Sequence, residues 1–297
     1  MKLYMRNLRP ELREEYLRMR AEAGGVSGLG GTDITTDDVL CAYIILVDFF
    51  TDPSRPEEAE SMLVGLRSGH LLASAVSRQV VGLGNRYKYT RALDRCATLF
   101  YGLVKDHAFS DGNKRVSLLT LLYHLDKFGY MPNVKAKEFE ALVVATAANE
   151  LPRQYPYQWQ KTDHSLPESD RRVAVIARCL KRMTKRKDNA FHVDITSREL
   201  CSILEGYQVT ANVSGGKVHF ERRIGKQNWF SKSRVRRASI PYRGDTRVVG
   251  AKTVRHVLSE LGLYDQVASY RELMDGADLR YTLIDQFEAP LRRLKDR

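Results

Sequence analysis

The sequence predicts a mainly α-helical domain followed by a small α+β domain of the order α-β-β-β-α. Apolar residues recur at helical spacing between about residues 35 and 151. After Thr196 they alternate on both sides of a turn at Ser214–Gly216, as in a β-hairpin. The two halves of the chain also differ in charge. Residues 166–297 contain 27 Lys+Arg and 16 Asp+Glu, whereas residues 1–165 contain 21 Lys+Arg and 20 Asp+Glu.

The predicted domain boundaries follow from these changes. We expect the helical domain at residues 1–160, a linker with a basic helix at residues 161–194, and the α+β domain with a helical tail at residues 195–297. The linker is indicated by Pro, Gln and Ser residues, and the basic helix by apolar residues at helical spacing among Lys and Arg.

Within the first domain the helices are predicted over residues 34–50, 65–80, 91–106, 115–129 and 135–151. The first begins with Thr or Asp caps and acidic residues, which favour a helix N-terminus. The fourth is apolar nearly all round, which is typical of a buried central helix, and Gly129 should end it. In the second domain Thr196 and Glu199 form a predicted capping box.

Composition excludes several classes of protein. Hydrophobic residues make up 43% of the chain, enough for a core, but the longest apolar run, Val39–Val47, is too short to span a bilayer. The N-terminus lacks an apolar signal core, and the four cysteines lie far apart without metal-ligand spacing. We expect a cytoplasmic protein with reduced thiols and no membrane partner. The positive second half favours a polyanionic partner such as RNA.

A polar cluster at Lys105–Leu119 lies between two predicted helices. A helix starting near Gly112 offers backbone N–H groups and a positive dipole end, which suit phosphate. Glycine lets the ligand approach the backbone, and three further residues add donors and charge. The predicted phosphate-binding residues are Gly112, Asn113, Lys114 and Arg115.

The rest of the cluster supplies the other parts of a transfer site. Asp111 is placed to hold Mg²⁺ against phosphate oxygens. The imidazole of His107 can accept a proton from a hydroxyl near neutral pH. Phe109, between them, can anchor the loop in the core. Together these residues indicate phosphoryl or nucleotidyl transfer.

The segment His107–Arg115 resembles the Fic/Doc signature HxFx[DE]GN[GK]R, and the likeness extends over about residues 35–155. It includes an upstream segment, "VGLRSGHLLASAVSRQ", similar to the family's flap. The resemblance implies a helical catalytic domain with His107 as general base, Asp111 as the Mg²⁺ ligand and ATP as co-substrate. It also implies transfer of AMP to a protein Ser, Thr or Tyr, or, in the death-on-curing (Doc) branch, phosphorylation of elongation factor Tu.

Two departures favour the Doc branch. Lys114 replaces the usual Fic glycine, and Leu118 stands where most AMP-transferring members carry a second arginine. They favour phosphorylation, with AMP transfer as the alternative. No convincing version of the family's inhibitory helix motif is present, so a toxin of this kind would need a separate antitoxin or a protected target.

Residues 195–264 resemble the small HicA-like toxins, whose α-β-β-β-α fold is related to double-stranded-RNA-binding domains. Aligning Phe220 with their phenylalanine puts Lys217 where their catalytic histidine would be, and His219 is offset by two residues on the same strand face. We therefore favour a non-cleaving RNA- or protein-binding domain, with a ribonuclease centred on His219 or a purely RNA-binding regulator as alternatives. The candidate RNA-binding residues are Lys217, His219, Trp229, Arg234, Arg236 and Arg237.

Overall fold

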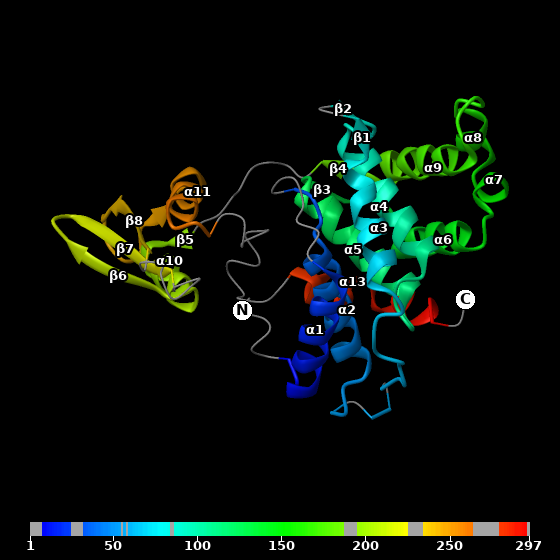
Figure 1. The fold of residues 1–297 in the computed structure, drawn as a ribbon. Coiled ribbons are helices and arrows are strands. Elements are labelled where there is room, and N and C mark those ends of the chain that lie inside the picture. The colour runs from blue at the N-terminus through cyan, green and yellow to red at the C-terminus, as the bar shows by residue number, and fades with distance from the viewer. Residues whose placement is uncertain are drawn as a thin grey trace. The chain divides into compact units, whose positions relative to one another are not determined.

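The computed structural model confirms the predicted fold class, a helical unit and a small α+β unit (Figure 1). The helical unit comprises Asn7–Lys187 together with Arg280–Arg297, and the small unit comprises Asp188–Leu279. Among the described residues, the small unit therefore lies in sequence between two parts of the helical unit. The structure describes residues 8–24, 32–54, 56–57, 59–83, 86–186, 195–224, 234–263 and 279–295.

Helices make up most of the helical unit. They are α1 (Pro10–Ala23), α2 (Thr36–Phe50), α3 (Gly69–Ser77), η2 (Arg78–Val80), α4 (Ala92–Asp106), α5 (Asn113–Lys127), α6 (Ala136–Ala147), α7 (Leu151–Gln154), α8 (Pro156–Gln160), α9 (Glu168–Met183) and α13 (Leu279–Arg293). Two short antiparallel pairs accompany them, β1 (Gly82–Leu83) with β2 (Arg86–Tyr87) and β3 (Tyr130–Pro132) with β4 (Thr184–Arg186).

The centre of the helical unit is the pair α4 and α5. Helix α5 packs on α2, α4 and α6 and is buried from Arg115 to Leu125, as its apolar sequence predicts. Gly129, at φ 74°, follows its end. Helix α2 begins with a capping box in which the Thr35 side chain accepts from Asp38 N. No helix among the described residues is both long and apolar enough to cross a membrane.

Two of the predicted boundaries are corrected by the packing. Helix α9, expected in the linker region, lies against α4 and buries an apolar face that includes Val173, Ile176 and Leu180. Helix α13, expected as a tail of the second domain, belongs to the helical unit, where the buried Arg280 side chain lies 3.3 Å from Asp38. Both helices have apolar faces that the helical bundle covers, and burial of those faces decides their place.

The small unit has the predicted α-β-β-β-α order. Its elements are β5 (Ile195–Thr196), α10 (Ser197–Gly206), β6 (Val209–Ser214), β7 (Lys217–Ile224), β8 (Arg234–Pro241), β9 (Val248–Val249) and α11 (Ala251–Glu260). Strands β6, β7 and β8 form an antiparallel sheet, and β5 pairs with β9. Gly215 and Gly216 both have positive φ, as a two-residue type I′ hairpin turn requires.

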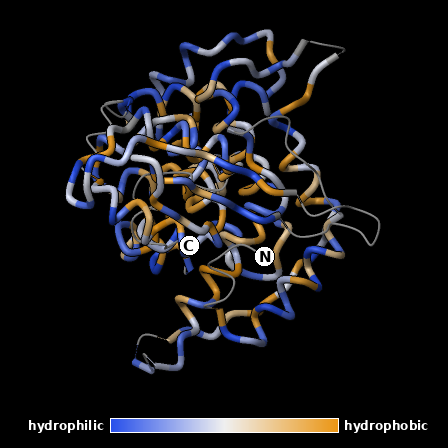
Figure 2. The backbone as a smooth tube through the Cα atoms, turned by 90° about the vertical axis from the view of Figure 1, so that its left-hand side faces the viewer, coloured by the Kyte–Doolittle hydropathy of each residue, from blue (hydrophilic) through white to orange (hydrophobic). Residues whose placement is uncertain are grey.

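Hydrophobic and hydrophilic residues alternate along these strands, and burial of the hydrophobic ones gives the sheet one core face and one solvent face. Figure 2 colours the backbone by the hydropathy of each residue. Val218, Phe220 and Ile240 share the core with Leu204 and Val257 of the two helices. The capping box at Thr196 and Glu199 begins α10 as predicted.

A buried histidine makes the stability of the helical unit depend on pH. His124 is fully buried in α5, and neither ring nitrogen has a hydrogen-bond partner among the described residues. Burial, with smaller contributions from Lys127 and Arg95, lowers its pKa from 6.5 to about 3. The unfolded chain therefore binds this proton more readily, and the stability present above pH 6.5 is lost as the pH falls toward 3.

We expect the unfolding free energy to fall by about 2 kcal/mol between pH 6.5 and about pH 5 because of His124, at about 1.36 kcal/mol per pH unit. Urea unfolding at both pH values measures this change. His124→Leu should flatten this part of the pH dependence, and a slope that survives the substitution would show that other groups cause it.

Candidate functional site

The polar cluster forms a tight loop between α4 and α5, with the predicted boundaries. Helix α4 ends at Asp106, and α5 begins at Asn113. His107, the C-cap of α4, is exposed and has the left-handed conformation, with φ 48° and ψ 52°. This conformation is uncommon for a residue with a side chain, and it turns the chain sharply away from α4. The candidate base thus lies at a fixed corner, open to solvent.

The start of α5 has the geometry of an anion site. Val116 N donates to Gly112 O at 2.9 Å as the first intrahelical bond of α5, so the three amides before it have no acceptor within the helix. Gly112 has φ 77°, and a Cβ atom there would lie 3.0 Å from Met62 Cε. Both the backbone conformation and the close methionine explain why glycine occupies this position.

Two side chains hold the loop in place. The Asn113 amide spans it, because its Oδ1 accepts from Phe109 N at 2.9 Å and its Nδ2 donates to Phe109 O at 2.8 Å. The Phe109 ring is buried and stacks on Tyr43, with 4.2 Å between the ring centroids. Phe109 therefore packs as an anchor would. Asn113 uses its side chain on the loop, which leaves its backbone amide as the group that can face a phosphate.

The flap-like segment lies directly beside the loop. Leu66 and Phe109 form an antiparallel bridge, in which Ser110 N donates to Gly65 O at 3.0 Å and Arg67 N donates to Ala108 O at 2.8 Å. Tyr43 joins the two parts, since its hydroxyl accepts from Gly65 N at 3.1 Å while its ring stacks on Phe109. The loop is thereby held on both sides.

Asp111 is the candidate metal ligand in the loop. Asp111 is half-buried, and its Oδ1 accepts from Gly112 N at 2.6 Å. No group of three His, Cys, Asp or Glu side chains suited to a metal occurs among the described residues. A single carboxylate beside a candidate phosphate-binding site is suited to Mg²⁺. This ion often binds one or two carboxylates and completes its coordination shell with substrate phosphates and water.

Arg115 has a different environment from the one expected of an exposed phosphate ligand. It is only 2% exposed, and its guanidinium donates to Glu60 at 2.8 Å, to Leu291 O at 2.8 Å and to Arg292 O at 3.2 Å. The last two acceptors are carbonyls in the final turn of α13. In this structure Arg115 therefore caps the C-terminus of α13, which its position in the sequence did not indicate.

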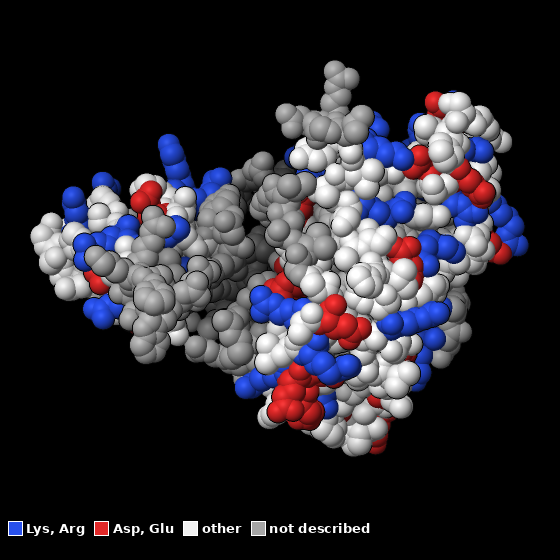
Figure 3. Space-filling model, viewed as in Figure 1, with Lys and Arg blue, Asp and Glu red and all other residues white. Residues whose placement is uncertain are grey.

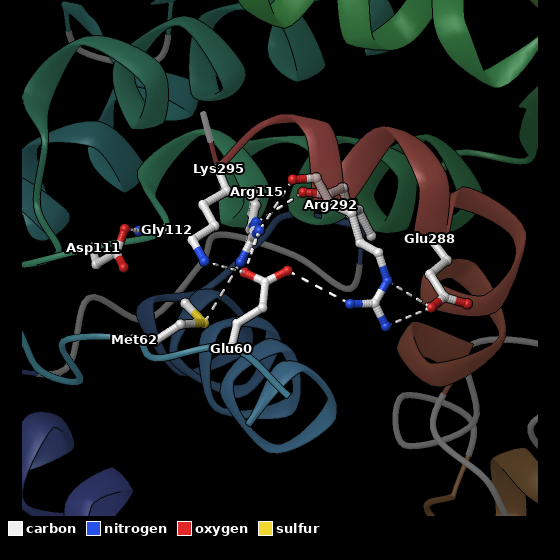
Figure 4. A network of polar contacts seen from close by, with 9 residues as sticks. Glu60, Met62, Asp111, Gly112, Arg115, Glu288, Arg292 and Lys295 are labelled. Carbon is white, nitrogen blue, oxygen red and sulfur yellow. Dashed lines mark hydrogen bonds and ion pairs between the residues drawn. The ribbon is translucent and has the colours of Figure 1, made fainter. Parts of the chain in front are cut away.

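Glu60 is the centre of this cluster (Figure 4). Besides Arg115, Arg292 lies 3.6 Å and Lys295 3.4 Å from its carboxylate. Lys295 and Arg115 converge on Glu60 from the side where Gly112 lies. A phosphate that reached Arg115 would have to compete with the Glu60 carboxylate.

In the small unit the candidate RNA-binding residues divide between the two sheet faces. Lys217, His219 and Arg237 are exposed and share the solvent face, where Arg237 pairs with Glu221 at 3.1 Å. The predicted alignment of Lys217 and His219 on one face is confirmed. Lys and Arg outnumber Asp and Glu on the face of this unit that Figure 3 shows.

Arg236 lies on the opposite face, because it is paired in register with Arg222. Its guanidinium packs against the backbone of Gly262, where a Cβ atom would lie 2.7 Å from its Cζ. Strand alternation therefore separates Arg236 from Arg237, and the role of Arg236 in RNA binding stays a prediction. Arg234 lies in β8, but its side chain, like all of Trp229, is outside the described residues.

Several residues at the site had no signal in the sequence. Tyr43 lies inside an apolar helical run and looked like an ordinary core residue. Glu60 lies in a loop, and the two α13 carbonyls lie 176 and 177 residues along the chain from Arg115. The one sequence signal that could have identified Tyr43 as part of the site is its hydroxyl group in the middle of an apolar run.

Residues 33–125 match the model of the Fic/DOC family, which is fewer than half of the residues in the chain. This region contains α2 to α5, the loop between α4 and α5 and the segment that bridges to it. No curated protein and no solved structure matched the chain. The match supports the resemblance for the helical unit. The small unit lies outside the matched region.

Proposed function

We propose that the helical unit transfers a phosphoryl group from ATP to a hydroxyl side chain of a target protein. The observation that supports this proposal is that an exposed histidine and the N-terminus of α5 lie at the two ends of one short loop, which contacts on both sides hold in place. The family match supports transfer of this general type to protein hydroxyls. The choice of phosphoryl over nucleotidyl transfer is our own inference.

Each group in the loop has a place in the reaction. ATP phosphates bind the first-turn amides of α5, with Lys114 adding charge. Asp111 would hold Mg²⁺, which when bound neutralises charge on the phosphate oxygens. His107 accepts the proton of the target hydroxyl as its oxygen attacks the γ-phosphorus. The bond between the γ-phosphorus and the bridging oxygen breaks, and ADP leaves.

Leu118 favours phosphoryl transfer. It is fully buried in α5, one turn after Lys114, where most AMP-transferring members of the family carry a second arginine. Without that arginine the γ-phosphate lacks one clamp that would keep it as part of the leaving group. In the alternative reaction the hydroxyl attacks the α-phosphorus, pyrophosphate leaves, and the same His107 accepts the proton.

The partners follow from the same resemblance. We propose a translation factor such as elongation factor Tu as the target class, modified on Ser, Thr or Tyr. The side chain of Leu63 is 70% exposed next to the bridge with the loop and offers an apolar contact for the target. A separate antitoxin would regulate the activity, since the sequence contains no convincing inhibitory motif.

Labelled ATP tests this function. The full-length protein is incubated with cell lysate, Mg²⁺ and ATP labelled at either the α- or the γ-phosphate, with chelated samples as the control. We expect a protein band labelled from γ-ATP only. Label from α-ATP on that band would establish nucleotidyl transfer instead. Absence of metal-dependent label from either nucleotide, with purified candidate targets also tested, would contradict the proposal.

A second candidate function concerns the small unit. The exposure of Lys217, His219 and Arg237 on one solvent face favours RNA binding. Ribonuclease activity is the alternative in which His219 acts as the base. Loss of RNA cleavage in His219→Ala, with cleavage intact in His107→Ala, would support that alternative.

A further inference from the structure

A row of exposed cations runs along the end of the helical unit's α9 and into β4. Its members, which we call the α9 stripe, are Arg178, Lys181, Arg182, Lys185 and Arg186. The three in α9 lie at helical spacing on one face, opposite the apolar face that packs on α4. None of the five forms an ion pair with a carboxylate of the described residues, whereas Arg172 pairs with Glu168. The stripe therefore carries uncompensated positive charge.

Cations stack on aromatic rings near both ends of α9, and one of these cations, Arg186, belongs to the α9 stripe. Helix α8 lies at one end of α9 and β4 at the other (Figure 1). At the first end the Arg171 guanidinium lies 4.0 Å from the centroid of the Trp159 ring, and Arg178 donates to Lys161 O at 2.7 Å. At the β4 end Arg186 lies 4.9 Å from the centroid of the Tyr130 ring. Cations that lie close to aromatic rings are typical of surfaces that bind single strands.

A hollow opens beside the α9 stripe. It has a volume of about 260 Å³ and is lined by Val134, Glu138, Ala141, Tyr155, Cys179, Arg182 and Met183. Arg182 thus belongs both to the stripe and to the hollow. Burial, together with Cys179 and Glu138, raises the pKa of Tyr155, which keeps its hydroxyl neutral. The hollow offers apolar walls, one aromatic ring and one carboxylate that can accept from an exocyclic amino group.

We propose that the α9 stripe and this hollow bind single-stranded nucleic acid. The stripe contacts the phosphates, and the hollow takes one unstacked base whose amino group donates to Glu138. An acidic peptide would use the stripe but not the hollow, and a membrane surface would leave the hollow empty. The site lies on the helical unit and consists of residues other than those of the His107 loop. It would let nucleic acid be recognised by the unit that carries the candidate transfer site.

The stripe is tested with a labelled single-stranded RNA and a DNA of the same sequence, about 12 nucleotides long, within the site sizes of known single-strand binders. Fluorescence anisotropy of the full-length protein gives the dissociation constant at several salt concentrations. Replacing three of the stripe cations (Arg178→Gln, Lys181→Gln and Lys185→Gln) should lower the slope of log K against log salt by about 2, at about 0.7 per phosphate contact.

The matched control removes three exposed arginines from other surfaces of the same unit (Arg18→Gln, Arg20→Gln and Arg91→Gln). We expect the control to keep the slope. Equal slopes for the stripe variant and wild type would overturn the proposal, as would equal losses in the stripe variant and the control. So would loss of binding only when Lys217 and Arg237 of the small unit are replaced.

The hollow is tested without a change of charge. Ala141→Phe fills it, and we expect single-strand affinity to fall about fivefold or more with an unchanged salt slope, since base stacking accounts for it. Ala21→Phe, on the exposed side of α1, is the control and should bind normally. Binding of duplex RNA, an acidic peptide or anionic vesicles as tightly as the single strand would overturn the assignment. The ratio of RNA affinity to DNA affinity shows which of the two nucleic acids the site prefers.

Discussion

Replacing His107 should lower the rate of transfer to the target by about 10²–10⁴-fold, the usual contribution of a general base. The exposed imidazole stands at the C-cap of α4, opposite the N-terminus of α5, where a target hydroxyl and the ATP phosphates would meet. Loss of the base leaves the phosphate-binding amides of α5 intact, so we expect kcat to fall while KM for ATP changes little.

The backbone at this position guides the choice of variant. With φ 48°, residue 107 is left-handed, a conformation that asparagine tolerates better than alanine. His107→Asn should therefore keep the loop and the stability of the unit while removing the base. His70→Ala, at an exposed position near the bridging segment, is the matched control and should retain activity. Full activity of a folded His107→Asn protein would show that another group accepts the proton.

The local part of this site was predictable from the sequence. The ends of α4 and α5 and the buried anchor Phe109 follow from patterns within nine residues. Such features depend on capping, glycine conformation and helical periodicity, which neighbouring residues determine. The same is true of the hairpin turn at Gly215 and of the capping box at Thr196.

The long-range part was not predictable. The basic character of α9 suggested a linker helix, but its apolar face packs on α4. Helix α13 follows the small unit in sequence yet completes the helical unit. Helical periodicity identifies the apolar face of a helix but not the element that packs against it. That partner depends on contacts between segments far apart in the chain. The environment of Arg115 could not be foreseen for the same reason.

We expect Arg115→Met to lower the unfolding free energy of the helical unit by about 3–5 kcal/mol, the usual cost of breaking a buried ion pair. The substitution keeps much of the side-chain volume but removes the donors to Glu60, Leu291 O and Arg292 O. It also removes the stacking of the guanidinium on Phe50, 4.4 Å from the ring centroid. Two carbonyls of the last turn of α13 would lose this donor, which adds to the cost.

Urea unfolding followed by far-UV circular dichroism measures this effect. The control is Arg153→Met, which breaks the exposed pair with Glu150 and should change stability by less than about 1 kcal/mol. An Arg115→Met protein as stable as wild type would mean that α13 is held by other contacts. In that case the capping role assigned to Arg115 is wrong.

The same residue separates a structural role from a phosphate-binding role. Glu60→Gln keeps a hydrogen-bond acceptor for Arg115 but removes the negative charge with which a phosphate would compete. If Arg115 binds ATP phosphate during the reaction, Glu60→Gln should lower KM for ATP, because the competing carboxylate is gone. If Arg115 only caps α13, Glu60→Gln should leave KM unchanged, while Arg115→Met loses activity only as far as it loses folded protein. A comparison of KM with the folded fraction in both variants therefore decides whether Arg115 only caps α13 or also binds an ATP phosphate.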